Sequence, residues 1–309
     1  MAIHSTMLAS LKYLSLLTFV AVIMFGHARM AVANQWQPQV KTVRVNNYDM
    51  AYVERGSGVP LILVHGSLSD YRTWLPLMAE LSETNRTIAI SLRHYYPEQW
   101  DGKGDDFSLN QHADDVAAFI KTLNLGAVDL LGHSRGGVVS MLVASQYPEL
   151  VNNLVLADPA PLWTMLSDNT KARKLLETRK SIAKKTVKFY QQGNPQGGLE
   201  TFVNYVAGPK AWEKTSETRR NTLRDNSWTQ VGQLQDFETQ FDCRSAGKIS
   251  SRVLMITGER SAPIYGYMHS ALQSCLKHSN NALIADAGHM MFHANPTAFT
   301  FEVQEFIAP

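Results

Sequence analysis

The chain has 309 residues, of which 45% are hydrophobic and 18% are charged. This length allows one large α/β domain with an insertion, or two small domains, and the composition is typical of a globular protein. There are 29 basic and 27 acidic residues, and no basic stripe with interleaved aromatic residues occurs. We therefore expect no nucleic-acid partner.

Residues 1–33 are predicted to be a secretory signal peptide. Lys12 precedes an apolar run, Tyr13–Phe25, that is too short to span a bilayer comfortably, and Ala31-Val32-Ala33 matches an A-x-A cleavage site. The alternative is an uncleaved membrane anchor. Cleavage after residue 33 removes Lys12 and Arg29 but no acidic residue, which leaves equal numbers of basic and acidic residues. We expect an exported protein, periplasmic or secreted, with no stable membrane span after cleavage.

Strand-like and helix-like segments alternate through the first half of the chain. Runs that are apolar on both faces, such as Leu61-Ile62-Leu63-Val64, are typical of strands buried in a parallel sheet. The alternation predicts βαβ units and one doubly wound, mostly parallel sheet. The expected elements are a hairpin over 43–53, a strand over 61–64, a helix over 71–81, a strand over 87–90, a helix over 111–123, a strand over 127–131, a helix over 138–144 and a strand over 154–157.

The alternation stops after residue 160. From about Trp163 to Gly247 the sequence is helical, charged and aromatic, with no strong strand, and it is too long for a loop. Strands resume at 253–256 and 282–284, and a helix follows at 296–307. We therefore predict an α/β core over residues 34–160 and 249–309, interrupted by an α-helical lid over residues 161–248. Such an insertion is expected over the C-terminal edge of the sheet, where open α/β folds place their sites.

Two further features of the second half concern charge and cysteine. Basic residues recur from Lys171 to Lys188, which is typical of a solvated helix face; attraction to an anionic lipid or an acidic substrate is the alternative. Cys243 and Cys275 flank a predicted strand, and an even pair in an exported protein predicts a disulfide, with two buried thiols as the alternative. No metal-ligand spacing and no phosphate-cradling glycine motif occurs, so we expect neither a metal nor another cofactor.

The most informative motif is Gly132-His133-Ser134-Arg135-Gly136. It lies between an apolar, strand-like run and a run of small and apolar residues that favours a helix. A sharp strand-to-helix turn at Ser134 would lift its hydroxyl clear of the sheet, and the two glycines leave room for that turn. The N–H group of Arg135 would then lie at a helix N-terminus, where it can receive developing negative charge. We interpret Ser134 as a nucleophile; the alternative is an ordinary strand–helix turn.

Over essentially all of the chain after residue 33, the sequence resembles the α/β-hydrolase fold family. The matching motifs are His65-Gly66-Ser67 with Trp74 downstream, Gly132–Gly136, Thr257-Gly258-Glu259 after a late strand, and Gly288-His289 before the last helix. The resemblance implies a Ser–His–acid hydrolase whose oxyanion hole is built from two loops.

This resemblance assigns the remaining roles. His289 is expected to be the base because the order Ser…acid…His is that of the family and because imidazole titrates near neutrality, with His293 as second choice. The oxyanion hole is expected to consist of the backbone N–H groups of Ser67 and Arg135. His65 is expected to hold its loop and to take no part in the chemistry.

The acid is where the sequence departs from the commonest family pattern. The usual position follows the strand 253–256, but Ser261 stands where Asp is commonly found. Asp158 follows the strand after the elbow helix, and some members of the fold take their acid from that strand. We prefer Asp158, because a carboxylate at a strand tip can be held rigidly against the imidazole; Glu259 is the alternative acid.

These residues predict a serine hydrolase that cleaves small to medium apolar carboxylic esters through an acyl-enzyme. A lactonase, a C–C bond hydrolase or a cofactor-free perhydrolase would use the same triad and differ in pocket shape. A serine at the elbow disfavours haloalkane dehalogenase and epoxide hydrolase, whose family members use Asp there. The alternative from another class is a non-catalytic protein that uses the same pocket to capture a small-molecule ligand.

Overall fold

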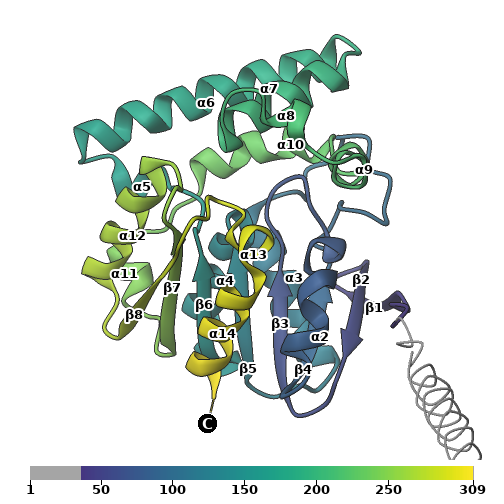
Figure 1. The fold of residues 1–309 in the computed structure, drawn as a ribbon, viewed down its shortest axis with the longest axis vertical. Helices are drawn as coiled ribbons and strands as arrows, with labels where there is room; N and C mark the ends of the chain where they lie inside the picture. The colour runs from purple at the N-terminus through teal and green to yellow at the C-terminus, as the bar shows by residue number, and fades with distance from the viewer. Residues whose placement is uncertain (1–35, 309) are drawn as a thin grey trace, which may run out of the picture. The chain divides into compact units, whose positions relative to one another are not determined.

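The computed structural model describes residues 36–308; the predicted signal peptide, residues 1–33, lies outside the described residues. Within them, eight strands form one sheet in the order β1-β2-β4-β3-β5-β6-β7-β8 (Figure 1). The pairs β1–β2 and β2–β4 are antiparallel and every other pair is parallel, which confirms the predicted fold class. The strands are β1 (Lys41–Val45), β2 (Tyr48–Arg55), β3 (Val59–Val64), β4 (Asn85–Ile90), β5 (Val128–His133), β6 (Val151–Ala157), β7 (Arg252–Gly258) and β8 (Ser279–Ile284).

Local sequence explains two connections near the start of the sheet. Asn46 and Asn47, between β1 and β2, both have positive φ, 44° and 62°, which a two-residue hairpin turn requires and asparagine tolerates. The helix expected over 71–81 is instead a 3₁₀ segment, η1 (Tyr71–Leu77), followed by a short helix, α2 (Met78–Leu81). Pro76 lies inside η1, and because proline lacks a backbone N–H it disfavours a regular α-helix at this point.

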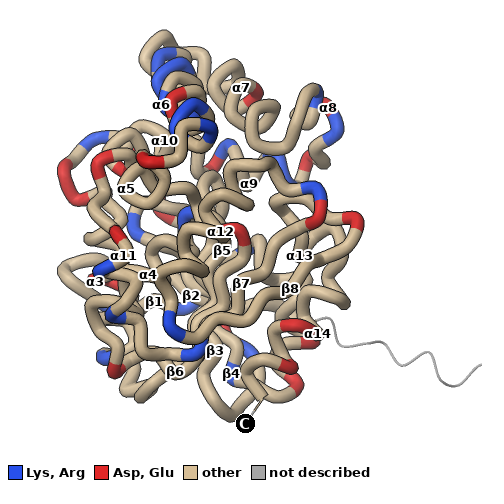
Figure 2. Tube along the Cα trace, turned by 90° about the vertical axis from the view of Figure 1, so that its left-hand side faces the viewer, with Lys and Arg blue, Asp and Glu red and all other residues tan. Residues whose placement is uncertain are grey.

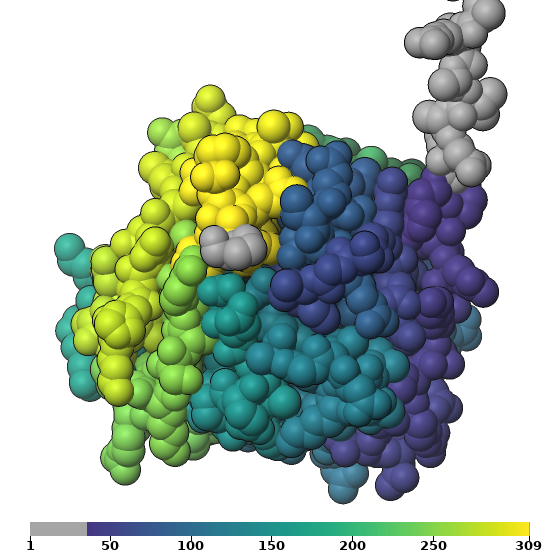
Figure 3. Space-filling model, turned by 90° about the horizontal axis from the view of Figure 1, so that it is seen from below, coloured from purple at the N-terminus to yellow at the C-terminus, as the bar shows by residue number. Residues whose placement is uncertain are grey.

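Helices of the core come from both halves of the chain. They are α3 (Leu109–Thr122), α4 (Arg135–Gln146) with the short η2 (Pro148–Leu150), α12 (Pro263–Cys275), α13 (Met291–Ala294) and α14 (Pro296–Ile307). Figure 3 shows the C-terminal segment, in yellow, beside the early segments, in blue. Gln304 of α14 donates a hydrogen bond to the Glu80 carbonyl of α2 at 3.0 Å. The residues before and after the insertion therefore build one core.

Between β6 and β7 the described chain contains helices and no strand. They are α5 (Trp163–Leu166), α6 (Thr170–Gln191), α7 (Pro195–Ala207), α8 (Ala211–Lys214), α9 (Glu217–Asp225), α10 (Thr229–Gly232), η3 (Gln233–Glu238) and α11 (Cys243–Ala246). Helices α6 to α10 gather beyond one end of the sheet, at the top of Figure 1. Within residues 36–308, no helix combines the length and the apolar character that crossing a bilayer needs.

Buried polar contacts fasten this insertion to the core. The guanidinium of Arg135 donates to the Asp236 carboxylate of η3 at 2.6 and 3.1 Å. Asn226 donates from its amide nitrogen to the Asp70 carboxylate at 2.7 Å. A disulfide between Cys243 and Cys275 joins α11 to α12, with Cα atoms 5.0 Å apart. The later part of the insertion, from Asn226 to Cys243, is therefore tied to the core.

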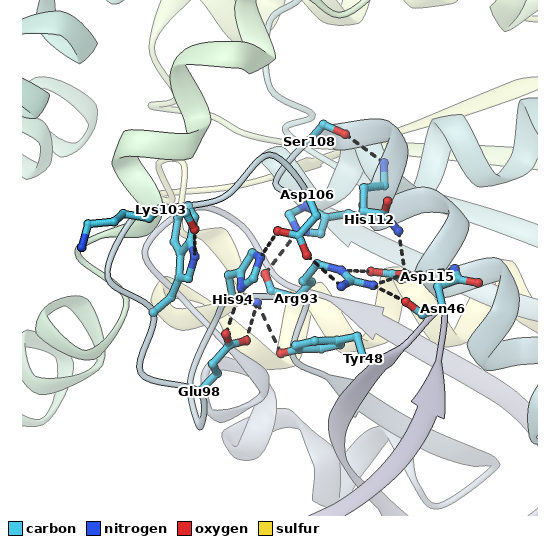
Figure 4. A network of polar contacts seen from close by, with 12 residues as sticks. Asn46, Tyr48, Arg93, His94, Glu98, Lys103, Asp106, Ser108, His112 and Asp115 are labelled. Atoms are coloured by element: carbon cyan, nitrogen blue, oxygen red, sulfur yellow. Dashed lines mark hydrogen bonds and ion pairs between the residues drawn. The ribbon is translucent and has the colours of Figure 1, made fainter.

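The connection from β4 to α3 is held by a second polar network (Figure 4). The two ring nitrogens of His94 lie 2.9 Å from a Glu98 carboxylate oxygen and 2.7 Å from an Asp106 one. Arg93 donates to Asp106 at 3.0 Å and to Asp115 of α3 at 2.8 Å. Burial opposes a charge on His94, but the two carboxylates outweigh it and raise the pKa of the imidazole. This network fixes a long loop that packs beneath the insertion.

Candidate active site

The turn between β5 and α4 has the strained geometry that its sequence predicts. Ser134 has φ 52° and ψ −118°, a conformation that non-glycine residues rarely adopt. A side chain at Gly132 would collide with the Gly136 carbonyl and the Ser140 hydroxyl, and one at Gly136 would collide with the carbonyls of Val64 and His65. The two glycines therefore let helix α4 and strand β3 approach the turn closely, with Ser134 at its tip.

The carboxylate of Asp158 lies against the imidazole of His289. Asp158 follows the last residue of β6, and its Oδ2 is 3.2 Å from Nδ1 of His289. The same oxygen accepts a 2.5 Å hydrogen bond from the hydroxyl of Ser261. Both Asp158 and His289 are buried. The Nδ1–H group of a neutral imidazole can thus donate to Asp158, which leaves Nε2 unprotonated, as a base requires.

Burial dominates the titration of this pair. It raises the pKa of Asp158 to about 7, against the hydrogen bond from Ser261 that favours the ionised carboxylate. Burial, with the positive charge of Arg179 acting in the same direction, lowers the pKa of His289 to about 3. The imidazole is consequently neutral in the resting protein and able to accept a proton. His289, whose pKa is displaced this far, is buried and lines a cavity, which marks a candidate functional site.

Tyr265 of α12 covers the other side of the imidazole. Its ring stacks on that of His289 with centroids 4.1 Å apart and planes 16° apart. Its hydroxyl lies 3.2 Å from Nε2 of His289. His133 contributes a further constraint, because its Nε2 lies 2.8 Å from the His289 carbonyl oxygen. The ring of His133 also lies against that of His289, with centroids 4.5 Å apart, so Asp158, Tyr265 and His133 all contact the imidazole.

The loop after β3 lies directly beside the elbow. A methyl group on Gly66 would lie 2.9 Å from Nδ1 of His133 and 3.1 Å from Cβ of Ser134. The loop is held by buried His65, whose Nδ1 donates to the Gly66 carbonyl at 2.8 Å and whose Nε2 accepts from the Leu92 N–H at 3.1 Å. This matches the structural role expected for His65. Ser67, the next residue, lines the same cavity as Ser134.

The other residues considered as acid or base do not contact Asp158 or His289 through their side chains, although His293 lines the same cavity. Glu259 is exposed, and its carboxylate accepts a 2.8 Å hydrogen bond from the Asp286 N–H group. His293 has its Nε2 3.1 Å from the Thr73 hydroxyl. Of the two carboxylates left open by the sequence, Asp158 is the one in contact with His289. Ser261, at the usual position of the acid, hydrogen-bonds to that carboxylate.

Ser134 and His289 line one cavity of about 620 Å³ between the insertion and the sheet. Its apolar wall comes largely from α7 and α9, with Phe202, Val203 and Leu223. Within residues 36–308, no three His, Cys, Asp or Glu side chains are grouped so as to hold a metal ion. The cavity is large enough for a small organic molecule, and its reactive side chains lie at the sheet end.

Sequence reasoning missed several residues of this cavity. Tyr265 lies in a helix that begins five residues after Gly258, and Arg219 lies in the insertion, whose packing no local pattern specifies. Ser261 could have been identified from the sequence, because it occupies the position where the family usually has its acid. A serine at that place predicts a hydrogen-bonding partner for an acid supplied by a neighbouring strand.

A model of the alpha/beta hydrolase fold matches residues 59–296. The 2-(acetamidomethylene)succinate hydrolase of Mesorhizobium japonicum is 37% identical over 108 residues, which are 35% of this chain and 38% of that protein. The chain matches 34% to 38% of the length of the first curated relatives. Among solved structures, an esterase from Exiguobacterium antarcticum has a TM-score of 0.73 at 18% identity, covering 88% of this chain and 100% of that one.

A hydrolase structure from Pseudomonas aeruginosa PA01 has a TM-score of 0.72 at 16% identity, covering 88% of this chain and 99% of that one. At such identities the likeness concerns the fold alone. The family model is the stronger finding, since it spans most of the chain, from β3 through the insertion to the start of the last helix. The protein therefore belongs to the α/β-hydrolase fold family.

Proposed function

We propose that this protein is a serine hydrolase that cleaves carboxylic esters through an acyl-enzyme. The observation that carries the proposal is the contact of Asp158 with His289 beside a strained Ser134 in one cavity. A nucleophile, a base and an acid that orients the base are the parts that acyl transfer requires. The similarity to the 2-(acetamidomethylene)succinate hydrolase of Mesorhizobium japonicum supports a hydrolase.

The mechanism assigns one task to each group. Nε2 of His289 takes the hydroxyl proton of Ser134 as the serine oxygen attacks the ester carbonyl. The backbone N–H groups of Ser67 and Arg135 receive the negative charge of the tetrahedral intermediate, because Arg135 is the first residue of α4 and its N–H has no partner within the helix. His289 then gives the proton to the leaving alcohol. Water repeats these steps on the acyl-enzyme and releases the acid.

Asp158 supports this cycle without touching the substrate. It accepts the Nδ1–H hydrogen bond of His289, which selects the tautomer with an unprotonated Nε2. When His289 becomes an imidazolium, the carboxylate stabilises its charge in a site from which water is largely excluded.

The apolar wall formed by α7 and α9 supports esters with small to medium acyl chains. The test uses residues 34–309 with p-nitrophenyl esters of increasing chain length, and compares the parent protein with Ser134→Ala. We expect hydrolysis by the parent and a loss of about a thousandfold or more in kcat for the variant. Ester hydrolysis that is unaffected by Ser134→Ala would overturn the proposal. Lactones are tested in parallel, because ring opening by the same residues would identify a lactonase.

A further inference from the structure

The cavity that contains Ser134 and His289 is lined by basic side chains and, within residues 36–308, by no acidic one. The basic residues are Arg72, Arg179, Lys214 and Arg219. Figure 2 shows the Lys and Arg residues of the insertion concentrated on α6 and near α8, beyond the end of the sheet. A one-sided set of charges in a cavity indicates either neutralisation by neighbouring carboxylates or a ligand of opposite charge.

Within residues 36–308, only Arg72 among these residues forms an ion pair with a carboxylate; Asp236 attracts Arg179 but pairs with Arg135. Arg72 forms ion pairs with Asp70 at 2.7 Å and with Asp225 at 2.9 Å. The other oxygen of Asp70 accepts from the backbone and side chain of Arg72, and Asn226 donates a further hydrogen bond to this carboxylate. Arg72 therefore neutralises the charge of Asp70.

Arg219 is the clearest case of an uncompensated charge. It lies in α9 and donates to the Ser69 hydroxyl at 3.3 Å, and within the described chain it forms no ion pair. Burial lowers the pKa of Arg219 to about 10; Asp70 attracts its charge and Arg72 opposes it. The guanidinium stays charged at neutral pH. The side chain is partly buried, and a partly desolvated cation without an ion-pair partner costs free energy that a bound anion would recover.

Arg179 reaches the same cavity from a different helix. It lies in α6, and among residues 36–308 it too has no ion-pair partner. Burial is the largest cause of the lowered pKa of His289, and the positive charge of Arg179 is the second. The charge of Arg179 therefore acts on the end of the cavity that contains His289. The charge of Arg219 acts in the same way on His293. The two guanidinium groups thus reach the cavity from α6 and α9.

We infer that Arg179 and Arg219 form a binding subsite for an oxyanion group, a carboxylate or a phosphate, carried by the substrate. A guanidinium presents paired N–H donors that match the two oxygens of such a group. The apolar wall of Phe202, Val203 and Leu223 then contacts the uncharged part of the molecule. This inference rests on the proposed function and narrows it to esters that carry a negative charge at one end.

The first arm of the test measures substrate preference. The p-nitrophenyl monoester of adipic acid places a carboxylate on the acyl side, and p-nitrophenyl hexanoate is its neutral counterpart. 4-Butyryloxybenzoate carries the carboxylate on the leaving group, and p-cresyl butyrate is its neutral counterpart. We expect kcat/KM for at least one charged ester to exceed that of its neutral counterpart about tenfold or more, mainly through KM. Equal values for both pairs would overturn the inference.

The second arm assigns the preference to the two residues. Arg179→Gln and Arg219→Gln are each expected to reduce the ratio of charged to neutral kcat/KM by about tenfold. The ratio is measured within one variant, so it does not depend on the fraction of folded protein. Arg173→Gln is the matched control, because Arg173 is an exposed residue of the same helix α6. A ratio that falls equally in the control would assign the preference to overall charge and contradict the subsite.

The third arm does not require turnover. Calorimetric titration of Ser134→Ala with adipate and with inorganic phosphate measures anion binding directly, and the stronger ligand identifies the oxyanion. If the anion binds and Arg219→Gln abolishes the binding, the subsite is supported even when no ester is cleaved. That result would overturn the proposed esterase activity and leave the subsite standing. Ester cleavage that depends on Ser134, with no charge preference and no anion binding, leaves the activity standing and overturns the subsite.

Discussion

At the scale of single residues, the site depends on one carboxylate shared between two donors. Oδ2 of Asp158 lies 3.2 Å from Nδ1 of His289 and 2.5 Å from the hydroxyl of Ser261. Burial disfavours the ionised carboxylate and the hydrogen bond from Ser261 favours it. Ser261 is therefore a positioning and tuning residue, and it replaces the acid that the family usually has at this place.

The ionisation of Asp158 and His289 should control how the rate of ester hydrolysis depends on pH. In the proposed mechanism, catalysis needs an ionised Asp158 beside a neutral His289, so a further proton on the pair stops it. Because burial raises the pKa of Asp158 to about 7, we expect kcat/KM to be constant above pH 7 and to fall tenfold per pH unit below it. The measurement is the pH profile of p-nitrophenyl ester hydrolysis. An acidic limb centred near the ordinary carboxylate pKa of about 4 would contradict this account.

Ser261→Ala should move that limb. Loss of the hydroxyl removes a hydrogen bond to the ionised form, so the pKa of Asp158 rises and the acidic limb shifts to higher pH by about half a unit to one unit. The same pH profile measures it. Ser270→Ala is the control, since the Ser270 hydroxyl bonds to the Gly266 carbonyl within α12. A limb that does not move would show that Ser261 has no electrostatic role.

Tyr265 presents a second test at this scale. Its hydroxyl lies 3.2 Å from Nε2 of His289, the nitrogen that accepts the proton of Ser134 in the proposed mechanism. Tyr265→Phe keeps the stacked ring and frees the lone pair of that nitrogen. We therefore expect kcat on p-nitrophenyl esters to equal or exceed that of the parent protein. A tenfold fall in kcat would instead assign the hydroxyl a part in proton transfer.

At the scale of elements, short sequence motifs predicted the features that depend on steric contacts between nearby segments. Gly132, Ser134 and Gly136 specify the elbow because the clashes they avoid are with adjoining segments of the same βαβ unit. Continuous apolar runs specified the parallel strands. The choice between Asp158 and Glu259 stayed open because both follow neighbouring strands, β6 and β7, and only their side-chain directions separate them. The helix expected at 71–81 was wrong in type, since Pro76 lies inside it.

A largely buried ion pair between Arg135 and Asp236 helps to hold the insertion to the core, and its loss should lower the free energy of unfolding. Arg135 is buried and donates twice to Asp236 of η3. Asp236→Ala leaves that guanidinium without its counter-charge, so we expect the free energy of unfolding to fall by about 3 kcal/mol. Urea denaturation measures the change. Asp168→Ala, at an exposed residue of the insertion, serves as control. A loss below about 0.5 kcal/mol would show that the pair contributes only as a surface contact does.

At the scale of the whole molecule, the cavity arises where two parts of the core and the insertion meet. Ser134 and His289 come from the two core segments, and Arg179 and Arg219 come from helices between them. The sequence predicts that an insertion exists, because the alternation of strands and helices stops. It does not predict which face of α6 or α9 is turned to the sheet, since both helices are charged around much of their surface. The basic subsite therefore required the structure.

We propose that the protein is exported and cleaved after Ala33. The A-x-A pattern at Ala31-Val32-Ala33 supports this, as does the disulfide between Cys243 and Cys275, because disulfides persist in oxidising compartments. Expression of the full chain in a Gram-negative host, followed by N-terminal sequencing of the periplasmic fraction, should give a chain that begins at Asn34. A full-length chain recovered in the membrane fraction would identify the segment as an anchor.

The central claim is that Ser134 is an activated nucleophile, and covalent labelling tests it most directly. A fluorophosphonate transfers its phosphonyl group to an activated serine oxygen and releases fluoride. Peptide mapping by mass spectrometry should find one adduct on the peptide that contains Ser134. We expect no adduct on this peptide in Ser134→Ala and much slower labelling in His289→Ala. An adduct on another serine, or labelling at an unchanged rate in His289→Ala, would contradict the account.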